Sequence, residues 1–175
     1  MGSKASKPPS PSPTVERPDE SHDEKAFHDV KHYIPLIETS EVTTIDLRSV
    51  VVGDEGASLL ADSLKTNMSV VDVNLVHASM GPLGIKALAS ALMINSSIAV
   101  LGLSANIVGD DGAIALAETL KVNTSLTKLY LSAVNIGDEG SIALAEALKR
   151  TLISKFYYCH VITLKGQVSL LWMRL

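Results

Sequence analysis

Paired carboxylates enclosed by glycines recur along this 175-residue chain and are its clearest candidates for chemistry. They occur as GDEG at 53–56, GDDG at 109–112 and GDEG at 137–140. Carboxylate oxygens suit Ca²⁺, so a calcium loop is the first interpretation. An EF-hand loop needs oxygen ligands at alternate positions and a distal glutamate, whereas each of these loops offers two adjacent carboxylates that point in different directions. The pattern therefore favours architecture over a metal site.

The corresponding loop at 81–84 supports this interpretation. It reads GPLG, so Pro82 stands where the other loops have Asp54, Asp110 and Asp138. Proline suits the first turn of a helix, because its missing N–H would be unpaired there in any case. We therefore expect the aspartates to begin helices, where a carboxylate gains about 0.3–1 kcal/mol from the helix dipole and the free N–H groups. The first glycine of each loop is expected to permit an unusual φ, and the second to allow close packing.

Composition excludes several other kinds of function. The net charge is −4 and no block of Lys or Arg occurs, which argues against nucleic-acid binding. A single cysteine, Cys159, excludes an internal disulfide and a zinc cluster. Cys159 and Ser104 lack an assigned base, so nucleophilic catalysis is not expected. The sequence thus predicts a protein that is not an enzyme and needs neither a metal nor a cofactor.

The acidic loops belong to a repeat with a period of 28 residues. Three sets of positions show it: Gly53, Gly81, Gly109 and Gly137; Ala61, Ala89, Ala117 and Ala145; Leu47, Leu75, Leu103 and Leu131. A fixed period of about 20–50 residues is typical of a solenoid or another repeat array. Each unit begins with an alternating stretch, such as KLYLS at 128–132, and continues with apolar residues at helical spacing. Neither element can bury its apolar face alone, so the units are expected to stack, with a parallel sheet inside the curve.

The segment LGLSANIVGDDGAIALAETLKVNTSL at 101–126 resembles the ribonuclease-inhibitor type of leucine-rich repeat, whose pattern is LxLxxNxLgdxGaxxLaeaLkxNxsL. The resemblance covers about residues 43–150. It implies an α/β fold: a short leucine-rich-repeat solenoid, a horseshoe segment of four 28-residue strand–helix units with a parallel inner sheet. The family includes inhibitors of ribonucleases, innate immune receptors and activators of the Ran GTPase, so the resemblance alone does not specify a function.

Two sets of asparagines complete the pattern. The family places an asparagine after each strand, but here only Asn106 fills that slot, and Val50, Ala78 and Val134 fill the others. We expect irregular turns there, because buried backbone groups lose a partner. A second set, Asn67, Asn95 and Asn123, follows the helices and opens N-glycosylation sequons. Without a secretory signal we expect these residues to end helices in the left-handed conformation instead.

The repeats occupy only part of the chain. Residues 1–24 form a Pro/Ser-rich leader that we expect to be disordered, 25–42 a capping half-repeat, and 43–150 the four repeats. Residues 151–175 are either an irregular C-terminal cap or the truncated end of a longer array. The leader begins MGSKAS, so Gly2 fits the myristoylation pattern. With neither a signal-peptide core nor a membrane-spanning run, the sequence predicts a cytoplasmic protein and leaves open a weak membrane contact through Gly2.

Outward strand positions are where a solenoid of this kind is expected to bind. The candidate partner-binding residues, which we call the strand-face set, are Asp46, Arg48, Asp72, Asn74, Ser104, Lys128, Tyr130 and Ser132. Arg48 and Tyr130 are of types enriched in binding hot spots. The sequence therefore predicts a non-catalytic module that binds another protein through its concave face. The alternative is a GTPase-activating protein resembling the Ran-directed family, which would depend on Arg48.

Overall fold

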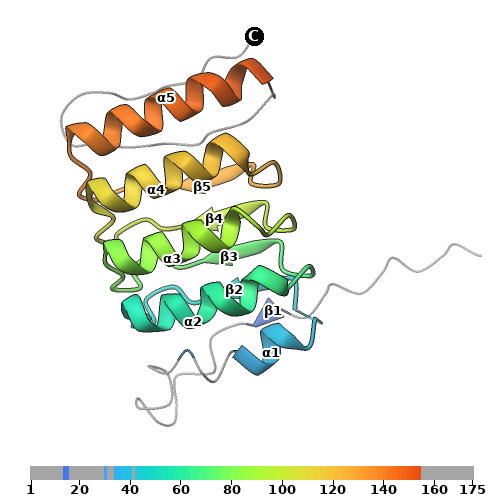
Figure 1. Cartoon of the computed structure of the whole chain (residues 1–175). Helices are drawn as coiled ribbons and strands as arrows, with labels where there is room; N and C mark the ends of the chain where they lie inside the picture. The colour runs from blue at the N-terminus through green and yellow to red at the C-terminus, as the bar shows by residue number, and fades with distance from the viewer. Residues whose placement is uncertain (1–13, 16–29, 31–33, 41, 155–175) are drawn as a thin grey trace, which may run out of the picture.

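The structure of the protein is a computed structural model, which describes residues 14–15, 30, 34–40 and 42–154 (Figure 1). Its strands are β1 Thr14–Val15, β2 Thr44–Asp46, β3 Asp72–Asn74, β4 Val100–Gly102 and β5 Lys128–Tyr130. Its helices are α1 Ile34–Glu38, α2 Gly53–Thr66, α3 Pro82–Leu92, α4 Gly109–Val122 and α5 Asp138–Ser154. The pairs β2–α2, β3–α3, β4–α4 and β5–α5 are units 1 to 4, and they stack in chain order. The predicted α/β solenoid of four strand–helix units is thus confirmed.

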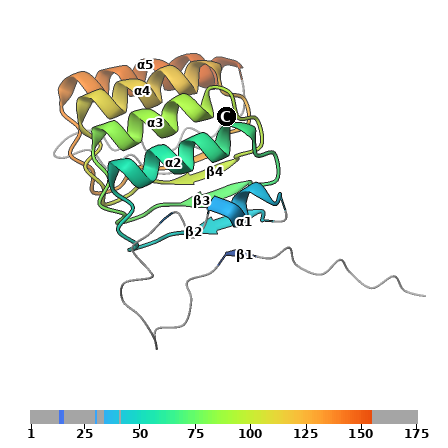
Figure 2. The ribbon, with the colours of Figure 1, turned by 60° about the horizontal axis from the view of Figure 1, so that its bottom comes forward.

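The strands form one parallel sheet in the order β1-β2-β3-β4-β5. Because all four units have the same length, equivalent residues lie side by side: Asn74 pairs with Asp46 on one side and with Gly102 on the other. The helices α2 to α5 form a layer on one side of the sheet (Figure 2). Among the described residues, no helix covers the opposite side.

The first strand comes from the leader. Thr14 pairs with Thr44, and Val15 pairs with Ile45, in parallel register. From sequence we expected these two residues to be disordered, and in the structure they are an extended strand beside β2. They thereby pair backbone groups that an edge strand would otherwise expose. The rest of residues 1–24, Gly2 included, and residues 155–175 lie outside the described part of the chain.

Alternate strand residues and one face of each helix build the core. The inward strand positions are buried in all four units: Ile45, Leu47, Val73, Leu75, Leu101, Leu103, Leu129 and Leu131. Val52, Met80, Val108 and Ile136, which return to the core between strand and helix, are buried as well. Burying a side chain of this size contributes about 1.5–3 kcal/mol, so these columns supply much of the stability. The 28-residue period predicted each of these positions.

Two aspartates of the acidic loops join successive units. Oδ1 of Asp54 accepts hydrogen bonds from the backbone N–H groups of Gly81, at 2.7 Å, and Gly84, at 2.8 Å. Oδ1 of Asp110 accepts equivalent bonds from the next unit, at 2.7 and 3.0 Å. Both aspartates lie in the first turn of their own helix, as predicted, but they hold the helix start of the following unit. We call this contact the aspartate bridge.

The glycine conformations follow the aspartate bridges. Gly53 and Gly109, whose turns receive no such bridge in the described part of the chain, have left-handed φ values of 62° and 64°. Gly81, which receives one, has φ −96°. The expectation of an unusual φ at the first glycine is therefore right for Gly53 and Gly109 and wrong for Gly81 and Gly137. At Gly109 the preceding unit has Pro82 in place of the aspartate, and its Cγ would lie 3.3 Å from a Cβ added at Gly109.

Asn106 bridges units 2 and 3, the junction at which Pro82 replaces a bridging aspartate. Its Oδ1 accepts hydrogen bonds from the N–H groups of Ala78 and Met80, both at 3.1 Å. Its Nδ2 donates to the carbonyl oxygens of Leu75, at 2.7 Å, and Leu103, at 2.9 Å. The side chain is buried, so these four bonds satisfy backbone groups that water would otherwise have to reach.

The turns without this asparagine pair through the main chain. The N–H of Ser49 donates to the carbonyl of Val76, and the N–H of His77 donates to that of Ser104, both at 2.9 Å. Each turn after a strand contains a non-glycine residue at positive φ: Ser49, His77, Ala105 and Ala133. Because Ala105 adjoins Asn106, the positive φ occurs with and without the asparagine, so it does not test the expectation of irregular turns.

The second set of asparagines forms a ladder between helix ends. Asn95 is 2% exposed, and its Nδ2 donates to the carbonyls of Leu64, at 2.8 Å, and Asn67, at 2.7 Å. Its Oδ1 accepts two backbone N–H groups of the following turn, both at 2.9 Å. The expected left-handed caps are wrong, because Asn67 and Asn123 are extended, with φ −75° and −68°. The amides are engaged between units and unavailable to a glycan in the folded protein.

Ala133→Gly is expected to raise the free energy of unfolding by about 0.5–1 kcal/mol. Ala133 is exposed and has φ 54°, a conformation that costs alanine about 1–2 kcal/mol and glycine little. The gain exceeds the entropy that glycine adds to the unfolded chain. Chemical denaturation measures the difference. The matched control is Ala143→Gly inside α5, which is expected to lose about 1 kcal/mol, and equal losses in both variants would contradict the strain.

Candidate partner-binding face

The strand-face set lies on the side of the sheet opposite the helix layer. One row crosses the strands in register: Asp46, Asn74, Gly102 and Tyr130. A second row contains Thr44, Asp72, Val100 and Lys128. A third follows the strand ends, where the N–H of Ser132 donates to Oγ of Ser104 at 3.0 Å. The sheet therefore brings residues from four units onto one face.

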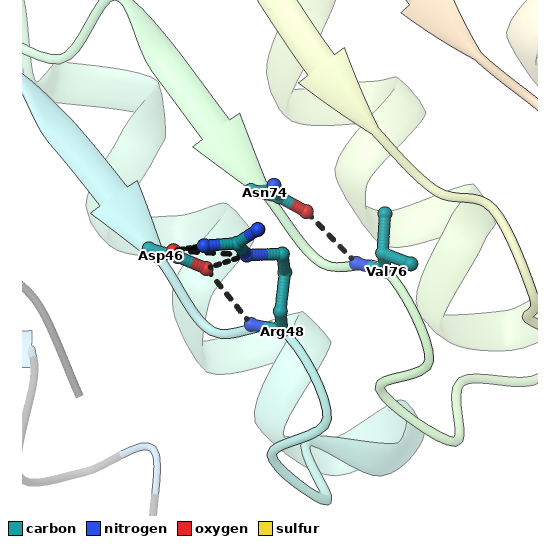
Figure 3. Close-up of polar contacts among 4 residues, drawn as sticks. All are labelled: Asp46, Arg48, Asn74 and Val76. Atoms are coloured by element: carbon teal, nitrogen blue, oxygen red, sulfur yellow. Dashed lines mark hydrogen bonds and ion pairs between the residues drawn. The ribbon is translucent and has the colours of Figure 1, made fainter.

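Arg48 folds back onto Asp46, two residues earlier (Figure 3). Its Nε lies 2.9 Å from both carboxylate oxygens, and its Nη2 lies 2.5 Å from Oδ2. Residues two apart on a strand share a face, which is why the pair forms. The hydrogen bond and charge of Asp46 raise the pKa of the Arg48 guanidinium. Asp46 and Arg48 are therefore paired with each other, and Arg48 is half-exposed.

Gly102 leaves the middle of the face without a projecting side chain. Oδ1 of Asn74 accepts the N–H of Val76 at 3.2 Å, so the amide lies along the sheet (Figure 3). A Cβ added at Gly102 would lie 3.1 Å from that Oδ1 and 3.4 Å from Cγ2 of Val76. Glycine inside a strand often marks a place where another chain approaches closely. Gly102 was not among the residues predicted to bind, although its place in the row between Asn74 and Tyr130 was visible in the repeat.

Asp72 and Lys128 are the charges of the face that no described residue pairs. They occupy equivalent positions on β3 and β5, with Val100 of β4 between them. The described residues make four ion pairs, and none of these includes either side chain. Burial is the main cause that raises the pKa of Asp72, the charge of Asp46 raises it further, and Lys128 lowers it. The sheet thus holds a carboxylate in a place that disfavours its charge.

Asp72→Asn is expected to stabilise the protein slightly at pH 7 and to have no effect near pH 3. Since the folded-state pKa of Asp72 is raised, the folded protein binds the proton more tightly, and stability falls as the pH rises through the window above the unfolded value. Removing the charge removes this loss, which solvent limits to about 0.5 kcal/mol. Thermal unfolding at the two pH values measures it. Asp62→Asn, which removes an exposed pair with Lys65, should not stabilise, and a loss of stability in Asp72→Asn at pH 7 would contradict the assignment.

The described residues provide neither a metal-binding cluster nor a membrane-spanning helix. No group of three or more His, Cys, Asp or Glu residues in this part of the chain is arranged to hold a metal ion. No helix within the described ranges is long and apolar enough to cross a membrane. Tyr130 is half-buried beside Gly102, and Ser104 and Ser132 are likewise partly exposed. The face therefore presents two opposite charges and an aromatic ring on a parallel sheet.

A family model described as Leucine Rich repeat matches residues 122–145, which span the end of α4, β5 and the start of α5. The solved structure entitled "Leiomodin-1 Actin-Binding Site 2 (ABS2)" is similar with a TM-score of 0.56 and 16% sequence identity, over 70% of this chain and 89% of that chain. The fold is a leucine-rich-repeat solenoid. The tropomodulin C-terminal domain of Caenorhabditis elegans matches with a TM-score of 0.47 and 14% identity, over 72% of this chain and 95% of that one. No curated protein sequence matches this chain.

Proposed function

We propose that this leucine-rich-repeat protein is a non-catalytic module that binds another protein through the helix-free face of its sheet. The observation that supports this most is the alignment of the strand-face set. Residues from four units converge on one face, and Asp72 and Lys128 have no ion-pair partner among the described residues. Solenoids provide extended surfaces of this kind for partners. The strands behind the face are already held by a buried core, which keeps the ordering cost of binding low.

Affinity capture from the source cell tests this function. The full-length protein is compared with a variant that carries Arg48→Ala and Tyr130→Ala. We expect capture of the specific partner to fall at least about tenfold, because arginine and tyrosine are frequent hot spots. The matched control carries Leu83→Ala and Ile142→Ala, two exposed apolar residues on helices. Loss in the control alone, or unchanged capture in both, would overturn the proposal.

Actin is one partner that merits a direct test. The leiomodin structure, which has the same fold, is named as an actin-binding site. Its sequence identity of 16% supports similarity of fold alone, so actin is a partner to test and not one that homology assigns. Co-sedimentation of the full-length protein with purified actin filaments decides it. Actin binding that the Arg48→Ala, Tyr130→Ala variant loses would identify the partner, and sedimentation equal to that without actin would exclude filaments.

The alternative, a GTPase activator of the Ran-directed kind, has less support. An arginine that completes a GTPase site must reach the nucleotide with its guanidinium. Arg48 is held by two carboxylate oxygens of Asp46 instead. Hydrolysis of GTP by candidate small GTPases separates the two functions. Acceleration that is lost in Arg48→Ala would favour the activator.

The membrane contact through Gly2 stands as a separate proposal. Its support is the sequence pattern at the start of the chain, which lies outside the described residues. A cytoplasmic protein with one acyl chain would bind membrane only marginally. Mass measurement of the N-terminal peptide from native cells tests it. An unmodified Gly2 or a retained Met1 would end the proposal.

A further inference from the structure

We infer that the row formed by Asp72, Val100 and Lys128 binds an α-helix of the partner that lies across the strands. This helix presents a basic side chain to Asp72, an apolar side chain to Val100 and an acidic side chain to Lys128. The inference rests on the proposed function and specifies the chemistry of its partner. It is argued from the register of this row, from the lack of ion-pair partners for its two charges among the described residues, and from its partial exposure.

The two charges set the first requirement. Asp72 and Lys128 carry opposite charges, lie in the same register row and have no ion-pair partner among the described residues. Burial and, to a smaller extent, the charge of Asp46 raise the pKa of the Asp72 carboxyl. A cation placed there relieves the cost of its charge, and an anion there would increase it. A partner is therefore selected by charge order, basic over β3 and acidic over β5.

The spacing sets the second requirement. Neighbouring strands lie about 4.8 Å apart, so the backbones at Asp72 and Lys128, two strands apart, are separated by about 10 Å. Residues i and i+7 of a helix share a face and lie about 10.5 Å apart, with i+3 and i+4 between them. Positions on one face of an extended strand lie about 6.8 or 13.6 Å apart and match less well. The row therefore fits two turns of a helix better than it fits an extended peptide.

The neighbouring row leaves room for this helix. β4 contributes Val100, which is partly exposed, and Gly102, which has no side chain to project. Tyr130 lies two residues beyond Lys128 on β5 and is partly exposed. It offers its ring to an apolar residue at the acidic end of the same helix. The helix thus contacts an apolar centre between two charges, an arrangement in which the charges fix its direction.

Selection from a displayed library of helical peptides tests the inference with full-length protein. The target variant carries Asp72→Lys with Lys128→Asp, which reverses the row and preserves the net charge. The matched control carries Lys86→Asp with Asp111→Lys, which reverses an exposed ion pair on the helix layer, 2.6 Å long in the structure. Circular dichroism and thermal unfolding establish that each variant is folded. Peptides selected on one protein are then measured on the others.

We expect the unmodified protein and the control to enrich peptides with a basic residue at i, an apolar residue at i+3 or i+4 and an acidic residue at i+7. The reversed variant is expected to enrich the opposite charge order and to bind the first set at least about tenfold more weakly. Enrichment that ignores the reversal, enrichment of extended peptides, or no enrichment at all would overturn the inference. If partner capture still depends on Arg48 and Tyr130 in that case, the proposed function stands without it.

Discussion

Asn106→Ala is expected to lower the free energy of unfolding by about 3 kcal/mol. The side chain is 5% exposed and makes five hydrogen bonds to backbone groups of units 2 and 3. Each buried polar group left without a partner costs about 1–3 kcal/mol, and water entering the space recovers part of this. For a chain of this size the melting temperature is expected to fall by roughly 6–12 °C. Urea unfolding followed by circular dichroism measures the loss.

The position of Asn106 explains why the loss is large. Units 1 and 2, and units 3 and 4, share an aspartate bridge, whereas units 2 and 3 have Pro82 at that position. Two other side chains also join these units: Oγ1 of Thr119 donates to the carbonyl of Ala89 at 3.0 Å, and Nδ2 of Asn123 donates to that of Leu92 at 2.6 Å. Asn135→Ala is the matched control, because Asn135 is exposed, and it should change stability by less than about 0.5 kcal/mol. Equal effects of the two substitutions would show that Asn106 does not join the units.

Gly84→Val is expected to destabilise the protein by about 3–4 kcal/mol. A Cβ at Gly84 would lie 2.9 Å from Cβ of Ala57 and 3.1 Å from the backbone Cα of Asp54, so α2 and α3 must separate. It would also lie 2.7 Å from the Asp54 oxygen that holds this turn. Overpacking costs about 1–3 kcal/mol, and losing the aspartate bridge adds about 1–2 kcal/mol. Differential scanning calorimetry and denaturant unfolding measure the sum.

Leu83→Val is the control for this substitution. Leu83 precedes Gly84 in α3 and is 69% exposed, so valine there changes helix propensity and little else. A loss below about 0.7 kcal/mol is expected. If Gly84→Val proved as mild as the control, the helices would have room to move apart, and the close approach between α2 and α3 would be refuted.

The period of the sequence was sufficient to predict the solenoid. Equal spacing of Leu47, Leu75, Leu103 and Leu131 defines one inward column, and stacking is the arrangement that buries it. The structure confirms the strands, the helices and the turn residues that return to the core. The prediction succeeded because each of these features depends on local periodicity within a unit and on identical units packing alike.

The polar contacts between units were harder to predict. Asp54 was expected near the N–H groups of a helix start, and it binds those of the next unit. Asn95 was expected to end a helix, and it bonds to residues 28 and 31 positions earlier. Such partners depend on how closely two units approach, which a spacing within one unit does not reveal. The recurrence of both residue types at the repeat period was the signal that they serve the stack.

For the strand-face set, too, the positions of the residues were predictable from sequence and their polar contacts were not. Alternation along each strand predicted which side chains point outward, and the register places them in rows. The pairing of Arg48 with Asp46 depends on side-chain rotation, and the recess at Gly102 depends on a neighbouring amide. The sequence therefore predicted which residues lie on the face, and the structure adds which charges the described residues leave unpaired.

Photo-cross-linking in the source cell tests most directly whether the helix-free face binds a protein. A benzophenone amino acid replaces Tyr130 on the face in one variant and exposed Ile142 on α5 in another. If the partner binds through the face, the variant labelled at position 130 forms an adduct with one protein, and the variant labelled at position 142 does not form that adduct. Adducts from position 142 alone, or from neither position, would contradict it.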